Sequence, residues 1–234
     1  ELVMRESAKK ERIVLPSTGK EVQVYIYGYS KKRVLLVHGW AGRGTQLYHI
    51  ADKILENKMM VVSFDAPAHG ISDGKRTNMV EFLEAIRLIE KKYGPFDAAV
   101  GHSFGGMSLI NAVAGGLKVN KLVTLGADNS IPEIFSYFVQ KMELKPEIAR
   151  RLKRRFEKKF NLRLDHFTSE HQAERIKIPV LVIHDSEDRF VPVSSAVAIR
   201  QKLQNGELLI THGLGHHKIF KSPVVVQRII DFLQ

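Results

Sequence analysis

The sequence contains no cysteine among its 234 residues. Disulfides, thiolate zinc sites and a cysteine nucleophile are therefore excluded, and the composition fits a reducing cytoplasm. Long apolar runs are also missing, since no window reaches the roughly 18 apolar residues that a membrane helix needs. Residues 1–10 are polar and charged, without the apolar core of a signal peptide. We therefore expect a cytoplasmic protein without a transmembrane segment, although the start at Glu1 leaves an upstream leader open.

Chain length indicates the number of domains, and charge indicates the kind of partner. The chain suits one substantial domain, here taken as 1–234, and its apolar fraction of 44% is ordinary for a globular protein. The formal net charge is +11, and the stretch from Lys141 to Arg163 alone holds ten basic and three acidic residues. Such a cluster can attract acidic substrates, membranes or nucleic acid. It can equally be a solvated helix face, which is the more common case.

Strand-like and helix-like segments alternate along most of the chain. The predicted strands are 12–15, 21–27, 33–37, 60–64, 98–101, 121–125, 180–184 and 207–210. The predicted helices between and after them are 45–57, 79–93, 103–114, 193–203 and 224–232. This alternation predicts an α/β fold with a mostly parallel sheet covered by helices on both faces. The first two strands, separated by Pro16-Ser-Thr-Gly19, predict an antiparallel hairpin.

The segment 128–177 interrupts this rhythm because it has no strand signal. Residues 131–142 and 146–160 have helical spacing, with Pro146 suited to a helix start. The segment is too long for an ordinary connection between two strands. We therefore expect a small helical lid inserted into the single domain, and this lid contains the basic cluster.

A Gly-x-Ser-x-Gly pattern has Ser103 at its centre, between Gly101 and Gly105. The pattern alone is weak, but here it joins a buried strand to a helix, which is the context of a nucleophile elbow. Side chains at the two glycine positions would collide with the neighbouring strand and helix. The sharp turn exposes the serine hydroxyl, so Ser103 is the candidate nucleophile. A glycine-rich turn without chemistry is the alternative.

A nucleophilic serine needs an imidazole to take its proton and an acid to orient that imidazole. His216 and His217 stand in a glycine-rich loop after the last predicted strand. Asp185 and Asp188 follow the strand before it, so both can supply the acid. The chain order is then Ser, Asp, His.

These motifs resemble the α/β-hydrolase superfamily from about residue 12 to residue 234. His38-Gly39 is similar to the family's oxyanion-loop signature. The stretch from Asp65 to Asp73 is similar to its Asp-x-x-Gly-His-Gly-x-Ser loop, with Ala68 in place of a glycine. The resemblance implies the backbone N–H groups of Trp40 and Phe104 as the oxyanion hole. Trp40 could instead be only a pocket wall, a role that its side chain suits.

The resemblance also bears on the acid and the base. The stretch 185–192 is similar to Gly-x-x-Asp-x-x-Val-Pro, which implies Asp188 as the acid although Asp185 stands at the glycine position. Gly-x-Gly-His implies His216 rather than His217 as the base. Asp128 is a third candidate acid, because some members of the superfamily carry the acid after the preceding strand.

Together these features predict a serine hydrolase that cleaves a small carboxylic ester by a Ser-His-Asp acyl-enzyme mechanism, with Ser103, His216 and Asp188 as the triad. A thioester or amide substrate is the first alternative, because the same machinery serves all three. The substrate would be anionic if the basic lid steers it. A non-catalytic binding protein using the basic lid is the second alternative, disfavoured because every triad position is filled. No cofactor or metal is expected, since His212 and His216 are not placed on a helix and no phosphate-binding glycine loop is present.

Overall fold

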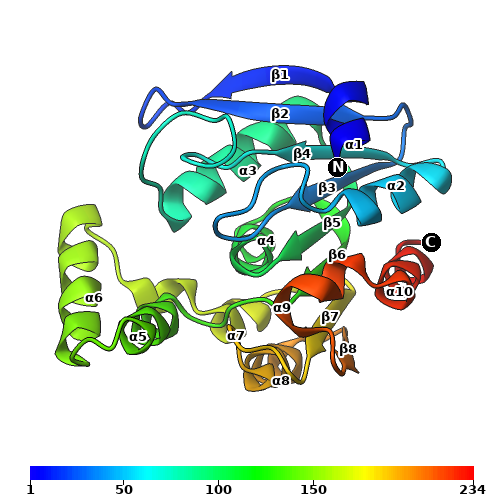
Figure 1. Cartoon of the computed structure of the whole chain (residues 1–234). Coiled ribbons are helices and arrows are strands. Elements are labelled where there is room, and N and C mark those ends of the chain that lie inside the picture. The colour runs from blue at the N-terminus through cyan, green and yellow to red at the C-terminus, as the bar shows by residue number, and fades with distance from the viewer.

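A single eight-stranded sheet runs through the protein, whose structure, a computed structural model, describes residues 1–234 (Figure 1). The strands are β1 (Lys9–Val14), β2 (Glu21–Tyr27), β3 (Arg33–Val37), β4 (Met60–Phe64), β5 (Phe96–His102), β6 (Val119–Leu125), β7 (Val180–Asp185) and β8 (Gly206–Thr211). Their order in the sheet is β1-β2-β4-β3-β5-β6-β7-β8. Strand β2 is antiparallel to both β1 and β4, and all other pairs are parallel. The predicted fold class is therefore confirmed, including the hairpin at the front.

Helices cover both faces of this sheet. The main ones are α2 (Tyr48–Glu56), α3 (Met79–Tyr93), α4 (Phe104–Ala114), α8 (Val193–Lys202) and α10 (Pro223–Leu233). Because side chains alternate along a strand, Leu35 and Val37 of β3 enter the core under α3, α4 and α8. Val34 and Leu36 enter the second core, under α2 and α10. Both faces of the central strands are thus buried, which is why their sequences are continuously apolar.

The segment between β6 and β7 contains only helices, as predicted. They are α5 (Ile131–Lys141), α6 (Glu147–Phe160), the 3₁₀ helix η1 (Leu164–Phe167) and α7 (Ser169–Ala173). Ser130 caps the start of helix α5, because its side chain accepts a hydrogen bond from the Glu133 N–H. Figure 1 shows α6 as the outermost element on one side of the molecule, with α5 between it and the remainder. Later in this segment, the Asn111 amide of α4 donates to the Phe167 carbonyl oxygen at 3.0 Å.

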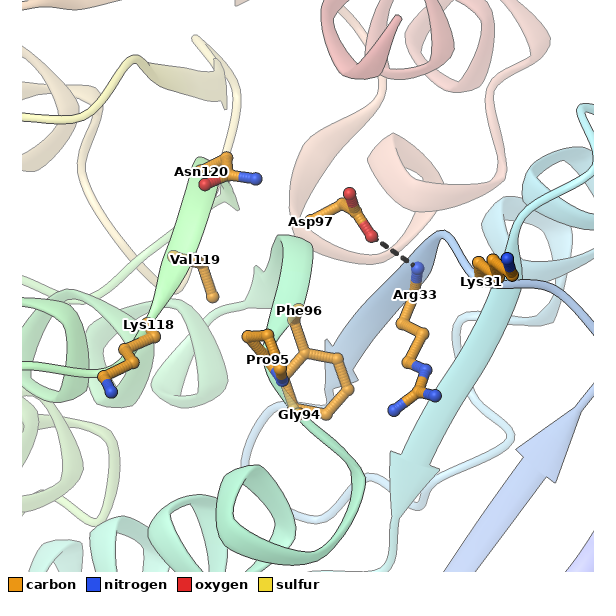
Figure 2. A pocket seen from close by; sticks show the side chains of 9 residues that line it. All are labelled: Lys31, Arg33, Gly94, Pro95, Phe96, Asp97, Lys118, Val119 and Asn120. Atoms are coloured by element: carbon orange, nitrogen blue, oxygen red, sulfur yellow. Dashed lines mark hydrogen bonds between the residues drawn. The ribbon is translucent and has the colours of Figure 1, made fainter.

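The loops that follow β3, β5, β6, β7 and β8 leave the sheet at one edge, because these strands are parallel. All the predicted site residues lie on these loops or on the helices that begin there. Figure 2 shows a pocket at the opposite edge, where the Asp97 carboxylate accepts a hydrogen bond from the Arg33 N–H at 2.8 Å. Residues from the amino ends of β3, β5 and β6 line that pocket, so it is separate from the candidate site. None of the helices is both long enough and apolar enough to span a bilayer.

Candidate active site

Ser103 occupies a strained turn between β5 and α4. Its φ of 53° and ψ of −124° are unusual for a residue with a side chain. Its N–H donates to the Leu125 carbonyl oxygen at the end of β6 at 2.9 Å, which fixes the turn. A Cβ at Gly101 would lie 2.7 Å from the Gly105 carbonyl oxygen, and one at Gly105 would collide with the Val37 carbonyl oxygen. The backbone therefore passes so closely here that only glycine fits at either position.

The Ser103 hydroxyl donates to Asp128, not to a histidine. The distance from Oγ to Oδ2 of Asp128 is 3.2 Å. Asp128 follows β6 and is half-buried, and burial raises the pKa of its carboxyl group to about 6. At neutral pH the carboxylate is thus the acceptor in this bond. Rotation about the Cα–Cβ bond of Ser103 is needed to turn the hydroxyl away from it.

The structure pairs His216 with Asp188. Nδ1 of the imidazole lies 2.6 Å from Oδ2 of the carboxylate, whose side chain is 1% exposed. The other carboxylate oxygen accepts the N–H groups of Phe190 at 2.8 Å and Val191 at 3.0 Å. Burial acts to raise the pKa of Asp188, but the hydrogen bonds from His216 and Val191 outweigh it and lower that pKa. An ionised Asp188 holds the proton of His216 on Nδ1 and leaves Nε2 free to accept another.

Asp185, the rival acid, has different partners. Its carboxylate accepts the Thr211 hydroxyl at 2.7 Å and the N–H groups of Leu214 and Glu187, both at 3.0 Å. Burial acts to raise the pKa of Asp185, and the Thr211 hydroxyl and the backbone donors lower it. Asp185 therefore ties the ends of β7 and β8 together and shapes the chain that leads to His216.

His216 lies on a short helix, α9 (Gly215–Lys218), so its placement in a loop was wrong. Gly213 and Gly215, with φ of 79° and 60°, turn the chain into this helix. Nε2 of His102, the residue before Ser103, lies 2.9 Å from the His216 carbonyl oxygen. This bond ties the backbone of His216 to the elbow. The periodicity of hydrophobic residues does not detect a helix of four residues that begins with a glycine.

The loop after β3 packs directly on the elbow. A Cβ at Gly39 would lie 2.9 Å from Cβ of Ser103. The N–H of Trp40 makes no backbone hydrogen bond, and Phe104 is the first residue of α4, where N–H groups lack acceptors within the helix. Both N–H groups are therefore without backbone acceptors, as the predicted role of stabilising a negative oxygen requires. The Trp40 ring lies edge-on to Phe104, with 5.3 Å between the ring centroids, and is half-exposed.

Two histidines brace this loop. Nε2 of His38 accepts the Ala66 N–H at 2.9 Å, and burial lowers the pKa of His38 to about 3, so the ring is neutral. Nε2 of His69 accepts the Ala41 N–H at 3.1 Å. These bonds join the loops after β3 and β4. Ala68, which stands where the similar pattern has glycine, has a φ of 62°, a conformation that favours glycine.

Two neighbours of the Asp188–His216 pair were missed by sequence reasoning. Nε2 of His184 lies 3.5 Å from the same Asp188 oxygen that contacts His216. The Phe190 ring lies 5.2 Å from the His216 ring and is half-exposed. His184 lies near the end of β7 and Phe190 lies in the loop that follows it. An alternating strand pattern carries no signal for whether these side chains contact Asp188 or His216.

The sequence matches the family described as alpha/beta hydrolase fold over residues 32–163, more than half of the chain. The chain belongs to the α/β-hydrolase superfamily. Residues 163–234 match the family described as TAP-like protein. No curated protein matches this α/β hydrolase.

Solved structures with this fold include two esterases. The esterase EaEST from Exiguobacterium antarcticum has a TM-score of 0.76 and 14% identity, covering 96% of this chain and 99% of that one. Est1E from Butyrivibrio proteoclasticus, with ferulic acid bound, has a TM-score of 0.72 and 18% identity, covering 94% and 97%. A thioesterase domain from the curacin biosynthetic pathway has a TM-score of 0.70 and 13% identity, covering 97% and 98%. At these identities the likeness shows the fold, and with the family match it supports a hydrolase.

Proposed function

We propose that this α/β hydrolase cleaves carboxylic esters through an acyl-enzyme, with Ser103 as nucleophile, His216 as base and Asp188 as acid. The observation that carries the proposal is the 2.6 Å bond between His216 and the buried Asp188, next to a serine on a strained elbow. A buried carboxylate bound to one imidazole nitrogen makes the other nitrogen a better proton acceptor.

The proposed reaction has two halves. The Ser103 hydroxyl turns from Asp128 toward Nε2 of His216, gives its proton to that nitrogen and attacks the ester carbonyl carbon. The N–H groups of Trp40 and Phe104 stabilise the negative oxygen. The C–O bond then breaks, and the alcohol leaves with the proton from His216. A water molecule attacks the acyl-enzyme in the same manner and releases the acid.

The 128–177 segment would serve as the lid in this proposal. Its helix α5 reaches the site through Tyr137, whose ring lies 6.1 Å from that of Phe190. Three of its apolar side chains, Ile134, Phe135 and Phe156, pack against the main core. They therefore hold the lid on the domain, while Phe138 is half-exposed.

Covalent labelling tests the nucleophile. The protein is treated with a fluorophosphonate probe, and the adduct is mapped by mass spectrometry. We expect the label on Ser103, its loss in Ser103→Ala, and unchanged labelling in the control Ser136→Ala, which alters an exposed serine on α5. Labelling that survives Ser103→Ala would refute the assignment.

A substrate panel tests the bond that is cleaved. Nitrophenyl esters of increasing acyl length are compared with an acyl thioester and an acyl anilide. The proposal expects esters to have the highest kcat/KM. Thioester hydrolysis without ester turnover would favour the thioesterase alternative, which a structure with the same fold already illustrates.

A further inference from the structure

Helix α6 has one face that is almost entirely basic. Six of its seven exposed residues are cationic, and the seventh is Glu147. We define the basic face by these six: Arg150, Arg151, Arg154, Arg155, Lys158 and Lys159. The opposite face carries Ile148, Leu152, Phe156 and Phe160 toward α5, and the Phe135 and Phe156 rings lie 6.3 Å apart. The helix is thus amphipathic, with its charge directed away from the protein.

The charges of the basic face are not neutralised within the chain. Arg150 pairs with Glu147 at 3.1 Å, and this is the face's only ion pair. Lys153, on the inner side, pairs with Asp165. A solvated helix face is usually balanced by alternating charges that form ion pairs along the helix. Five adjacent unpaired cations on the outermost element of the molecule (Figure 1) instead suit an anionic partner.

Exposed apolar side chains lie beside this charge. The turn between α5 and α6 presents Met142, which is 56% exposed, and Leu144, which is 43% exposed. Phe138 on α5 is 53% exposed. Basic residues adjoining exposed apolar side chains are typical of helices that lie at a lipid interface. Binding to nucleic acid is carried mainly by charge and does not call for exposed aliphatic side chains.

We propose that the basic face and the α5–α6 turn bind an anionic lipid surface. The arginine and lysine side chains contact the lipid phosphates, and Met142 and Leu144 enter the interface between headgroups and acyl chains. This binding goes beyond the proposed ester hydrolysis and does not require Ser103. It therefore can be measured on a protein that cannot hydrolyse the lipid by the proposed mechanism.

Vesicle sedimentation tests the proposal. The full chain with Ser103→Ala is mixed with vesicles of phosphatidylcholine alone or of phosphatidylcholine with phosphatidylglycerol. We expect binding to the anionic vesicles and a steep decrease as salt is added. Each basic residue near an anionic surface strengthens binding roughly fivefold, so the triple variant R151Q/R154Q/R155Q should bind about a hundredfold more weakly.

The control removes equal charge from the other side of the protein. Lys31, Lys32 and Lys118 are exposed and unpaired at the amino-terminal edge of the sheet, where Figure 2 shows two of them. The variant K31Q/K32Q/K118Q should retain binding within about twofold, because these charges lie outside the proposed contact. Equal losses in both triple variants would overturn the proposal, since only net charge would then matter.

A second pair of measurements separates lipid from nucleic acid. Met142→Ser with Leu144→Ser leaves the charge unchanged and should weaken vesicle binding severalfold. Unchanged vesicle binding in this double variant would overturn the proposal. Tight binding of an RNA or DNA oligonucleotide through the basic face, without binding to anionic vesicles, would also overturn it. All of these side chains are exposed, so the substitutions leave the fold intact.

Discussion

Replacing Asp188 by Asn removes the charge beside His216 and keeps the shape of the side chain. The Phe190 and Val191 N–H groups hold one side-chain oxygen in place, so the amide oxygen of Asn will occupy that position. The NH₂ group then faces Nδ1 of His216 and donates to it. This forces the imidazole proton onto Nε2, which can no longer accept the serine proton. The wrong tautomer and the lost charge should together lower kcat by on the order of 10³–10⁴.

Asp185→Asn is the matched control because the chemical change is identical and the partners differ. The Asp185 carboxylate accepts three hydrogen bonds from Thr211, Leu214 and Glu187, and an amide cannot accept all three. A buried donor left without its acceptor costs about 1–3 kcal/mol, so the melting temperature should fall. The tautomer of His216 is not affected, and we expect kcat to fall by less than about tenfold.

Both variants are measured with the same nitrophenyl ester, recording kcat, KM and the melting temperature. We expect Asp188→Asn to lower mainly kcat and Asp185→Asn to lower mainly the melting temperature. An Asp188→Asn enzyme that retains kcat within about tenfold would show that the Asp188–His216 bond does not serve catalysis. A larger loss of kcat in Asp185→Asn would assign the acid to that residue instead.

Three further predictions concern the elbow and the charges around it. Because burial raises the pKa of Asp128 to about 6, the folded state binds its proton more tightly than the unfolded state, and stability falls as pH rises from the unfolded pKa through 6. Asp128→Asn should therefore raise the melting temperature at pH 8 relative to the parent and bring less gain at pH 4, and an equal gain at both pH values would contradict this. Gly105→Ala should lower both the melting temperature and kcat, because its Cβ would collide with the Val37 carbonyl oxygen and displace the neighbouring Phe104 N–H; unchanged values in calorimetry and kinetics would argue against the close backbone approach. If the basic face steers substrate, kcat/KM for an anionic ester should fall with added salt while that of a matched neutral ester stays constant. If kcat/KM depends on salt equally for the two esters, the basic face does not steer the substrate.

Local sequence patterns were sufficient to predict most strands and long helices. The apolar runs at 33–37 and 60–64 predicted β3 and β4, and the spacing at 79–93 predicted α3, all with the observed ends. Strands and long helices are recognisable because burial on a face imposes a period on the sequence itself. The crowding at Gly101 is likewise local, since its Cβ would meet Gly105 across the strand-to-helix turn, whereas the crowding at Gly105 comes from Val37 of β3 and is tertiary.

These patterns do not predict short helices. Helices α1 (Leu2–Ser7), α7 and α9 span only four to six residues, too few to display a period. Helices of this length are not stable by themselves, and tertiary contacts hold them. His216 lies on one of them, α9. The sequence predicted that this histidine follows the last strand, but not that it lies on a helix.

The partners of the site side chains were decided only by the tertiary structure. The residue pattern by itself left Asp185 and Asp188 as alternatives, and it did not indicate that Ser103 donates to Asp128. His216 is 28 residues from Asp188, and Ser103 is 25 residues from Asp128. A change of a few tenths of an ångström in the donor–acceptor distance makes or breaks a hydrogen bond. The sheet and its loops set the distances between such segments. The sequence determined which chemical groups reach this edge of the sheet, because each follows a recognisable strand, and the packing of the loops determined which of them touch.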